Sequence, residues 1–265
     1  MQPFAERDRL ATLLAPDRGK IRAVARGAQR GRGPLAGVVQ PFVRARLLLW
    51  EGRSLDGISQ AEVLARPSHL DRDLRRFAAA CYLCELADGL SAERSEASGL
   101  YARLLQGLWL VDAPEAVPEP EVALCWADLA LLTAAGFGPE LGRCAGCGAP
   151  VGSGEPARFA AAAGGLLCRA CGAGEAGGVV VSGSAVRALR FLAQADARQV
   201  PRVRMGPRTL AEVRAALGTH VDAVLGRPLR SRGLLEALPR GEAIPAAAPQ
   251  AGAPARPADR GAVDG

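Results

Sequence analysis

Long apolar runs, lysines and catalytic signatures are what this sequence lacks. No stretch approaches the ~18 consecutive apolar residues of a membrane-spanning helix, and the N-terminal MQPFAERDRL has no signal-peptide core. There is no G-x-x-x-x-G-K-[ST] phosphate-binding loop and no G-x-S-x-G nucleophile elbow, and the carboxylates form no acid–base constellation. The sequence therefore predicts a soluble cytoplasmic protein that is not an enzyme and has no membrane partner.

Positive charge is concentrated in one part of the chain. The net charge is +6, and 32 of the 33 basic residues are arginine, a bias that accompanies abundant alanine and glycine and means little by itself. Residues 18–50, however, contain eight basic residues and no acidic one. Such a surface attracts polyanions, although a merely solvated basic face is the plainer alternative. The candidate DNA-binding residues in this segment are Lys20, Arg22, Arg26, Arg30, Arg32, Arg44 and Arg46.

Residues 10–65 have the pattern of short β-strands separated by glycine, proline and aspartate. In GKIRAVAR, the apolar residues Ile21, Ala23 and Ala25 alternate with positions that carry most of the charge. In FVRARLLLW, the expected inward residues are Val43, Ala45, Leu47 and Leu49, and the expected outward residues are Phe42, Arg44, Arg46 and Trp50. Strands that offer arginines and aromatic rings on one face suit single-stranded nucleic acid, as in small OB-type barrels.

From residue 68 onward the apolar period becomes helical. The expected helices span His69–Leu90, Glu93–Val111, Glu121–Phe137, Ser184–Asp196, Thr209–Leu225 and Arg232–Leu238. Ser68 and Ser91 are the expected N-caps of the first two helices. We therefore expect an α+β protein with a β-domain at residues 1–66, a helical domain at 67–240, and a disordered tail rich in alanine, proline and glycine at 241–265.

Four of the seven cysteines form two Cys-x-x-Cys pairs that are twenty residues apart. The candidate metal ligands are Cys144, Cys147, Cys168 and Cys171. Zinc takes four thiolates in a tetrahedral shell, and glycines beside the cysteines allow the tight turns that aim two thiolates at one ion. A closed shell leaves no position for an activated water, so the zinc predicted for residues 144–171 is structural. A redox dithiol is the alternative for either pair taken alone.

The remaining three cysteines lie in apolar segments of helical period. Cys81 and Cys84 form a further Cys-x-x-Cys pair, but no glycine turn accompanies them, and Cys125 has similar surroundings. Cysteine is among the residue types most often buried in proteins. We therefore expect all three to be structural residues of helices rather than metal ligands.

A zinc element beside a basic β-region leaves several functions open. The residues suit a DNA-binding protein, a zinc-ribbon transcription factor or adaptor that reads base edges, or a zinc hydrolase with an open metal position. A second arginine-rich stretch, residues 187–232, holds ten arginines and three acidic residues. This stretch suits a second nucleic-acid face or a dock for an acidic peptide.

The chain resembles the bacterial DNA repair protein RecO family over most of residues 10–238. The matching strand, basic loop and strand are GKIRAVARGAQRGRGPLAGVVQPF, and the first helical pair is AAACYLCELADGLSAERSEASGLYARLL. The zinc segment is matched by LLTAAGFGPELGRCAGCG and RFAAAAGGLLCRAC, and the C-terminal helices by THVDAVLGRPLRSRGLLEAL. Single pieces are unspecific, but their combination and order are specific to the family.

The resemblance implies an N-terminal OB-fold followed by an α-helical domain with an inserted zinc-binding element. It also implies a protein that breaks no bonds, binds single- and double-stranded DNA and anneals complementary strands. The implied partners are RecR, the acidic C-terminal tail of single-stranded DNA-binding protein (SSB) and, indirectly, RecA, and the implied location is the nucleoid. The family has a β-strand before the stretch that matches RDRLATLLAP, so the barrel here is either one strand short or begins upstream of Met1.

Overall fold

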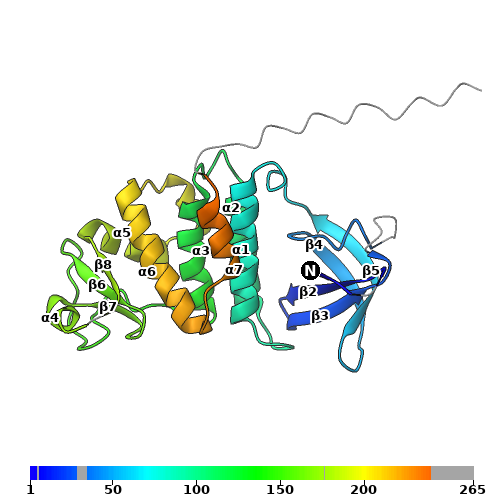
Figure 1. The fold of residues 1–265 in the computed structure, drawn as a ribbon, viewed down its shortest axis with the longest axis horizontal. Coiled ribbons are helices and arrows are strands. Elements are labelled where there is room, and N and C mark those ends of the chain that lie inside the picture. The colour runs from blue at the N-terminus through cyan, green and yellow to red at the C-terminus, as the bar shows by residue number, and fades with distance from the viewer. Residues whose placement is uncertain (5, 29–34, 176, 240–265) are drawn as a thin grey trace, which may run out of the picture.

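The computed structural model describes residues 1–4, 6–28, 35–175 and 177–239. In this structure a five-stranded N-terminal sheet, a central group of helices and a small second sheet follow one another along the long axis of the molecule (Figure 1). The fold is therefore α+β, as expected. Two candidate DNA-binding residues, Arg30 and Arg32, and the tail at residues 241–265 lie outside the described residues.

The N-terminal sheet has the strand order of a partly open Greek-key barrel of the OB type. Its strands are β1 (Gln2–Pro3), β2 (Arg9–Ala15), β3 (Gly19–Ala25), β4 (Arg44–Trp50) and β5 (Asp56–Ala65). They run in the order β1-β2-β3-β5-β4, and the pairing between β3 and β5 is parallel, whereas the others are antiparallel. A strand does precede β2, but it has two residues, and within the described part of the chain it does not reach β4 to close the barrel.

The inner face of the N-terminal sheet is apolar, as the alternating sequence predicts. Ile21, Ala23 and Ala25 of β3 are buried, and Leu47 and Leu49 of β4 pack against the same cluster. One expected outward residue was placed wrongly, since Phe42 lies before β4 in a left-handed conformation with φ of 63°. Its ring packs edge-on against Phe77 of the helical region, with ring centroids 5.4 Å apart.

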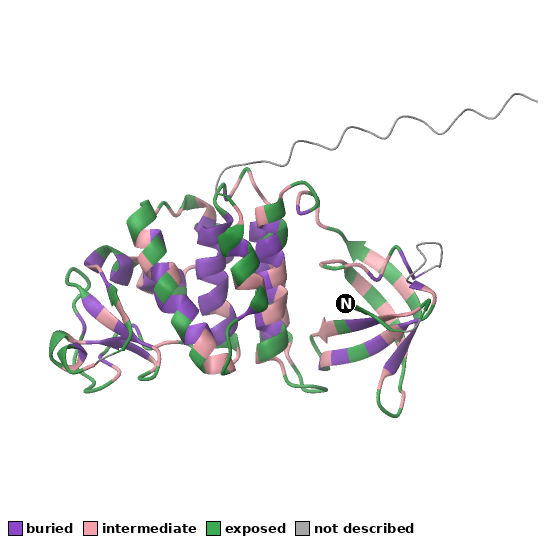
Figure 2. Cartoon of the chain, viewed as in Figure 1, coloured by how far each residue is buried: buried purple, intermediate pink, exposed green. Residues whose placement is uncertain are grey.

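In the described residues, six longer helices and two short ones follow the N-terminal sheet. They are α1 (Leu74–Leu90), α2 (Ser98–Val111), α3 (Pro120–Ala134), α4 (Arg169–Ala173), α5 (Gly183–Gln194), the 3-10 helix η2 (Ala197–Arg202), α6 (Pro207–Leu225) and α7 (Arg230–Ala237). Helix α3 is buried along nearly its whole length and forms the centre of the core (Figure 2). No helix in the described ranges is both long and apolar enough to cross a membrane.

The starts of α1 and α2 differ from the predicted ones. Asp73 caps α1 by accepting hydrogen bonds from the backbone amides of residues 75 and 76, so Ser68 is not the cap. The Ser68 amide instead donates to Asp112, which holds the preceding turn against the end of α2. Ser91 ends α1 and does not cap α2, whose N-cap position is Ala97. The contact from Asp112 that holds Ser68 in a turn is distant in the sequence, whereas the cap Asp73 lies directly before α1.

The N-terminal sheet meets the helices through the β2–β3 hairpin. The Lys20 amide donates to the Ala92 carbonyl at 3.2 Å, and the Lys20 carbonyl accepts from the Arg94 amide at 3.1 Å. Gly19 has φ of +61°, and a Cβ on it would collide with the Ser95 carbonyl. Backbone therefore contacts backbone at this joint, which needs glycine at position 19.

The cysteine-rich segment contains a second, three-stranded sheet that the sequence did not predict. Its strands β6 (Ala157–Ala160), β7 (Gly165–Leu167) and β8 (Val179–Val181) pair in the order β7-β6-β8. Strands of three or four residues are too short to show a period in the sequence. Phe159 and Leu166 of this sheet are fully buried against the helical core, so the segment contributes to that core directly.

Candidate metal centre and nucleic-acid interface

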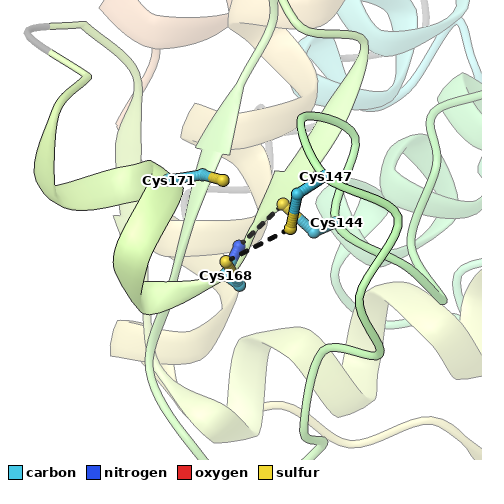
Figure 3. Close-up of side chains that lie close together, drawn as sticks. All are labelled: Cys144, Cys147, Cys168 and Cys171. Atoms are coloured by element: carbon cyan, nitrogen blue, oxygen red, sulfur yellow. Dashed lines mark hydrogen bonds between the residues drawn. The ribbon is translucent and has the colours of Figure 1, made fainter.

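The structure brings together the four cysteines that the spacing predicts as metal ligands. The sulfurs of Cys144, Cys147, Cys168 and Cys171 all lie within 4.8 Å of one another, and Figure 3 shows them converging from two chain segments. Four sulfurs about 2.3 Å from one ion in a tetrahedron lie roughly 3.8 Å apart. The separation of the Cys147 and Cys168 sulfurs is 3.8 Å. The cluster therefore has the size and ligand set of a metal site.

Local backbone geometry prepares the first of these thiols for a metal. The Cys168 amide donates to the Cys144 sulfur at 3.3 Å, and this hydrogen bond leads the effects that lower the pKa of Cys144 to about 6. The Cys144 amide donates to the Ala149 carbonyl, and Gly148 takes a left-handed φ of +75°, which together close a tight turn around the first pair. Cys168 stands at the N-terminus of α4, and Cys171 lies one helical turn later. Each pair is thus held by a compact local turn.

The four-cysteine cluster is connected to the helical core through Arg190 of α5. Its guanidinium donates to the carbonyls of Leu141 and Val151, each at 2.6 Å, on either side of the first cysteine pair. His220 of α6 packs edge-on against Phe159, with ring centroids 5.7 Å apart. The cysteine segment therefore contacts both α5 and α6, so disruption of the segment should destabilise the helical core.

The other three cysteines are helical residues, as expected. Cys125 of α3 is fully buried, and burial raises its pKa to about 12. Cys81 and Cys84 of α1 are partly exposed in a cavity of about 680 Å³ that also contacts β2, β4 and α2. Burial raises the pKa of Cys84 to about 12 and also raises the pKa of Cys81, so both remain protonated thiols at neutral pH. The cavity includes none of the four clustered cysteines, but Arg44 of the predicted DNA-binding residues also lines it.

The predicted arginines share the outer face of the N-terminal sheet. Arg22 lies on β3, Arg26 directly after it, and Arg44 and Arg46 on β4, and all four are exposed. Among the described residues, no carboxylate lies within ion-pair distance of Arg22, Arg26 or Arg44. Arg46 meets Glu62 of β5 at 2.9 Å, but this pair is well exposed and weak. The outer face thus presents uncompensated positive charge.

Lys20 differs from the other predicted cationic residues. Its ammonium lies 3.1 Å from the Asp88 carboxylate and also donates to the Asp88 carbonyl at 2.6 Å. The side chain is largely buried at the joint between β3 and the end of α1. Its positive charge is therefore paired within the protein. No local pattern could have signalled this role, because Asp88 is 68 residues away along the chain.

Most arginines of the second arginine-rich stretch, residues 187–232, make hydrogen bonds within the protein. Seven of its ten arginine side chains donate hydrogen bonds to other groups of the chain: Arg187, Arg190, Arg204, Arg208, Arg214, Arg227 and Arg232. Arg214, for example, pairs with the buried Asp128 at 2.9 Å. The stretch therefore offers much less free charge than its composition indicates.

Two family models match this chain and identify the family to which it belongs. The model described as "Recombination protein O N terminal" matches residues 1–66, and that described as "Recombination protein O C terminal" matches residues 71–233. The chain belongs to the RecO family. The first match covers the N-terminal sheet, and the second covers α1 to α6, the start of α7 and the four-cysteine cluster. The resemblance seen in the sequence is confirmed.

Individual relatives agree with the family models. A protein named DNA repair protein RecO from Symbiobacterium thermophilum is 38% identical over 236 residues, which cover 89% of this chain and 92% of that protein. The protein of the same name from Desulforudis audaxviator is 46% identical over 168 residues, 63% of this chain and 64% of the relative. That from Heliobacterium modesticaldum is 33% identical over 240 residues, 89% of this chain and 86% of the relative. Membership of this family supports a role in DNA repair and recombination.

Proposed function

We propose that this protein is a recombination mediator that binds single- and double-stranded DNA and anneals complementary strands. The observation that carries the proposal is the arginine face formed by Arg22, Arg26, Arg44 and Arg46, which opposes an apolar inner face. Cations on one surface offset the repulsion between two phosphate backbones as their bases pair, and no bond is made or broken. We propose the domain limits 1–66 for the DNA-binding domain and 67–240 for the helical domain.

Charge reversal on the arginine face tests this function. The variant Arg22→Glu/Arg44→Glu should bind single-stranded DNA far more weakly. Its affinity should also depend less steeply on salt, with the slope reduced by about 0.7 for each phosphate that is no longer neutralised. The matched control is Arg208→Glu, since Arg208 is 88% exposed on α6 and lies outside the N-terminal sheet. Equal binding by all three proteins, or binding that does not change with salt, would disprove the proposed interface.

Strand annealing separates a mediator from a simple DNA-binding protein. Complementary oligonucleotides coated with SSB should anneal faster with the wild-type protein, and the double charge-reversal variant should lose most of this acceleration. A reader of base edges would prefer particular sequences by roughly 1–3 kcal/mol per contacted base pair. An annealing mediator should treat unrelated sequences alike, so a strong sequence preference would favour a zinc-ribbon DNA adaptor instead.

We further propose that the four-cysteine cluster binds structural zinc. Zinc in a complete thiolate shell crosslinks two chain segments and supplies folding free energy. The protein should contain one zinc per chain, and Cys144→Ser should lower its zinc content and the thermal stability of the helical core. DNA affinity should fall mainly through this destabilisation. A Cys144→Ser protein that stays as stable as the wild type but loses DNA binding would instead make the cluster a DNA-contacting element.

For the acidic C-terminal tail of SSB, we propose a dock beside η2. A small groove of about 190 Å³ there is lined by Val117, Val122, Val200, Val203, Met205 and Arg204, among others. Arg198 and Arg202 of η2 are exposed nearby, and no described acceptor binds their guanidinium groups. Free arginines beside this groove complement the charge of an acidic tail. Arg198→Ala/Arg202→Ala should weaken binding of a labelled tail peptide but leave binding of naked DNA unchanged.

Cooperation with RecR in loading RecA onto SSB-coated DNA completes the proposed role, which places the protein at the nucleoid in the cytoplasm. The observation behind it is membership of the RecO family. A loading assay with RecA, RecR and SSB should show faster filament formation when the protein is added. Acceleration that is the same without RecR would contradict this part of the proposal.

A further inference from the structure

Trp50 occupies an unusual position on the outer face of the N-terminal sheet. It is the last residue of β4, opposite Gly57 of β5, and it is 46% exposed. A Cβ added to Gly57 would fall within the indole, so the ring occupies the space that a side chain at position 57 would fill. Gly57 is in turn paired with Val24 of β3. Glycine at this position thus lets a large ring lie over the middle of the sheet.

The Trp50 ring is covered loosely by a cation. The guanidinium carbon of Arg26 lies over it, 5.6 Å from the ring centroid. Atoms in direct van der Waals contact are about 3.5–4.0 Å apart, so this guanidinium is not tightly stacked. At an exposed site such an interaction is weak. Another flat group can therefore displace Arg26 from the ring at little cost.

We propose that Trp50 is a stacking platform for one unpaired base of single-stranded DNA. On binding, the base takes the place of the Arg26 guanidinium over the indole, and the released guanidinium contacts a neighbouring phosphate. Arg22 and Arg46 lie on the same face of the sheet, where they can bind further phosphates. This inference rests on the proposed function, because it assigns one base contact within the arginine face. It also predicts that single strands are preferred, since a paired base is not free to stack.

The expected effect follows from the competition between base and cation. Loss of one base–aromatic stack lowers affinity by roughly 5- to 150-fold, and the displaced cation offsets part of that gain. We therefore expect Trp50→Ala to bind oligothymidylate about five- to tenfold more weakly than wild type. Trp50→Phe retains a ring and should lose less. The control Trp109→Ala removes a tryptophan that is 53% exposed on α2 and should change nothing.

An abasic probe separates stacking from charge. An oligonucleotide of the same length with abasic sites in place of bases keeps the phosphates but cannot stack. Wild type should prefer oligothymidylate to this probe, and Trp50→Ala should lose the preference while its affinity for the abasic probe stays unchanged. Equal loss for both probes, or no preference in the wild type, would overturn the platform. The proposed function would survive that result if the charge-reversal variants still failed to bind, and it fails separately if wild type binds neither probe.

A variant that moves the ring without altering it gives an independent measurement. In Gly57→Ala the new methyl group must push the Trp50 indole away. The φ of residue 57 is not positive, so alanine does not strain the backbone there. We expect this variant to lose the preference for oligothymidylate as Trp50→Ala does. In a Trp109→Phe background, with Trp126 buried in the core, oligothymidylate should change the fluorescence of Trp50 and the abasic probe should not. Unchanged fluorescence with oligothymidylate bound would refute the stack.

Discussion

The buried ion pair of Asp128 and Arg214 leads to a specific prediction about the stability of the fold. Asp128 of α3 is fully buried, and Arg214 of α6 reaches it with a charge-assisted hydrogen bond of 2.9 Å. The same guanidinium lies 5.2 Å from the ring centroid of Tyr82 on α1. The pair therefore links three helices at the centre of the core. Arg214→Met keeps much of the side-chain volume but leaves the carboxylate without its cation.

Removing one partner of a buried ion pair costs about 3–5 kcal/mol, because the other charge remains buried and unpaired. For a domain of this size, that corresponds to a fall in Tm of roughly 10 °C. The matched control is Arg208→Met, which lies earlier on the same helix and whose arginine side chain is 88% exposed in its pair with Glu212. An exposed pair of that kind contributes about 0–1 kcal/mol. The two substitutions should therefore differ several-fold in their effect on the free energy of unfolding.

The pH dependence provides a second readout for Arg214→Met. Burial raises the pKa of Asp128 and Arg214 opposes this effect, so removal of Arg214 should raise that pKa further. A carboxyl group whose pKa is higher in the folded state than in the unfolded state favours folding at low pH and loses that contribution as pH rises through the folded pKa. Urea unfolding should thus show a smaller loss at acidic than at neutral pH, and Asp128→Asn/Arg214→Met should recover part of it. A loss no larger than that of Arg208→Met, or one independent of pH, would refute the role given to this pair.

Three further experiments test the contacts of Lys20 and Gly19 between the N-terminal sheet and the helices, and the contact of Glu85 between α1 and α7. Lys20→Ala should lower Tm but change the salt dependence of DNA binding little, because Lys20 is paired with Asp88 of α1. Arg22→Ala should leave Tm nearly unchanged and make DNA binding less dependent on salt. If Lys20→Ala instead reduced the salt dependence without lowering Tm, Lys20 would belong to the DNA interface. Gly19→Ala should lower Tm much more than Gly27→Ala, since both have positive φ but only the first would collide with a carbonyl. Burial would raise the pKa of Glu85, but hydrogen bonds from the start of α7 hold that pKa at about 2. Its contribution to stability is present above pH ~4.3 and is lost as the pH falls toward 2, so Glu85→Gln should flatten that part of the stability curve.

Local patterns in the sequence predicted the features that neighbouring residues determine. The two-residue period placed Ile21 and Leu47 on the inner face of the sheet, and the Cys-x-x-Cys spacing identified all four members of the cysteine cluster, because each pair closes through its own turn. Distant partners explain part of what was predicted wrongly. Phe42 packs on α1, and Ser68, the expected cap, donates its amide to Asp112 at the end of α2. The observed cap of α1, Asp73, is by contrast a local residue directly before the helix.

The arginines show why composition alone does not locate a nucleic-acid interface. A chain with one lysine must use arginine for nearly every cationic role, and the guanidinium, with five donors in a rigid fork, also serves as an internal clamp. Arg76, which is 2% exposed, donates to the carbonyls of Val111, Val117 and Pro118 and so fixes the loop between α2 and α3. Such clamps contribute to net charge but cannot bind phosphate. The better candidates are exposed arginines without a buried internal acceptor, and on the N-terminal sheet Arg22, Arg44 and Arg46 lie on the outer face, opposite its apolar side.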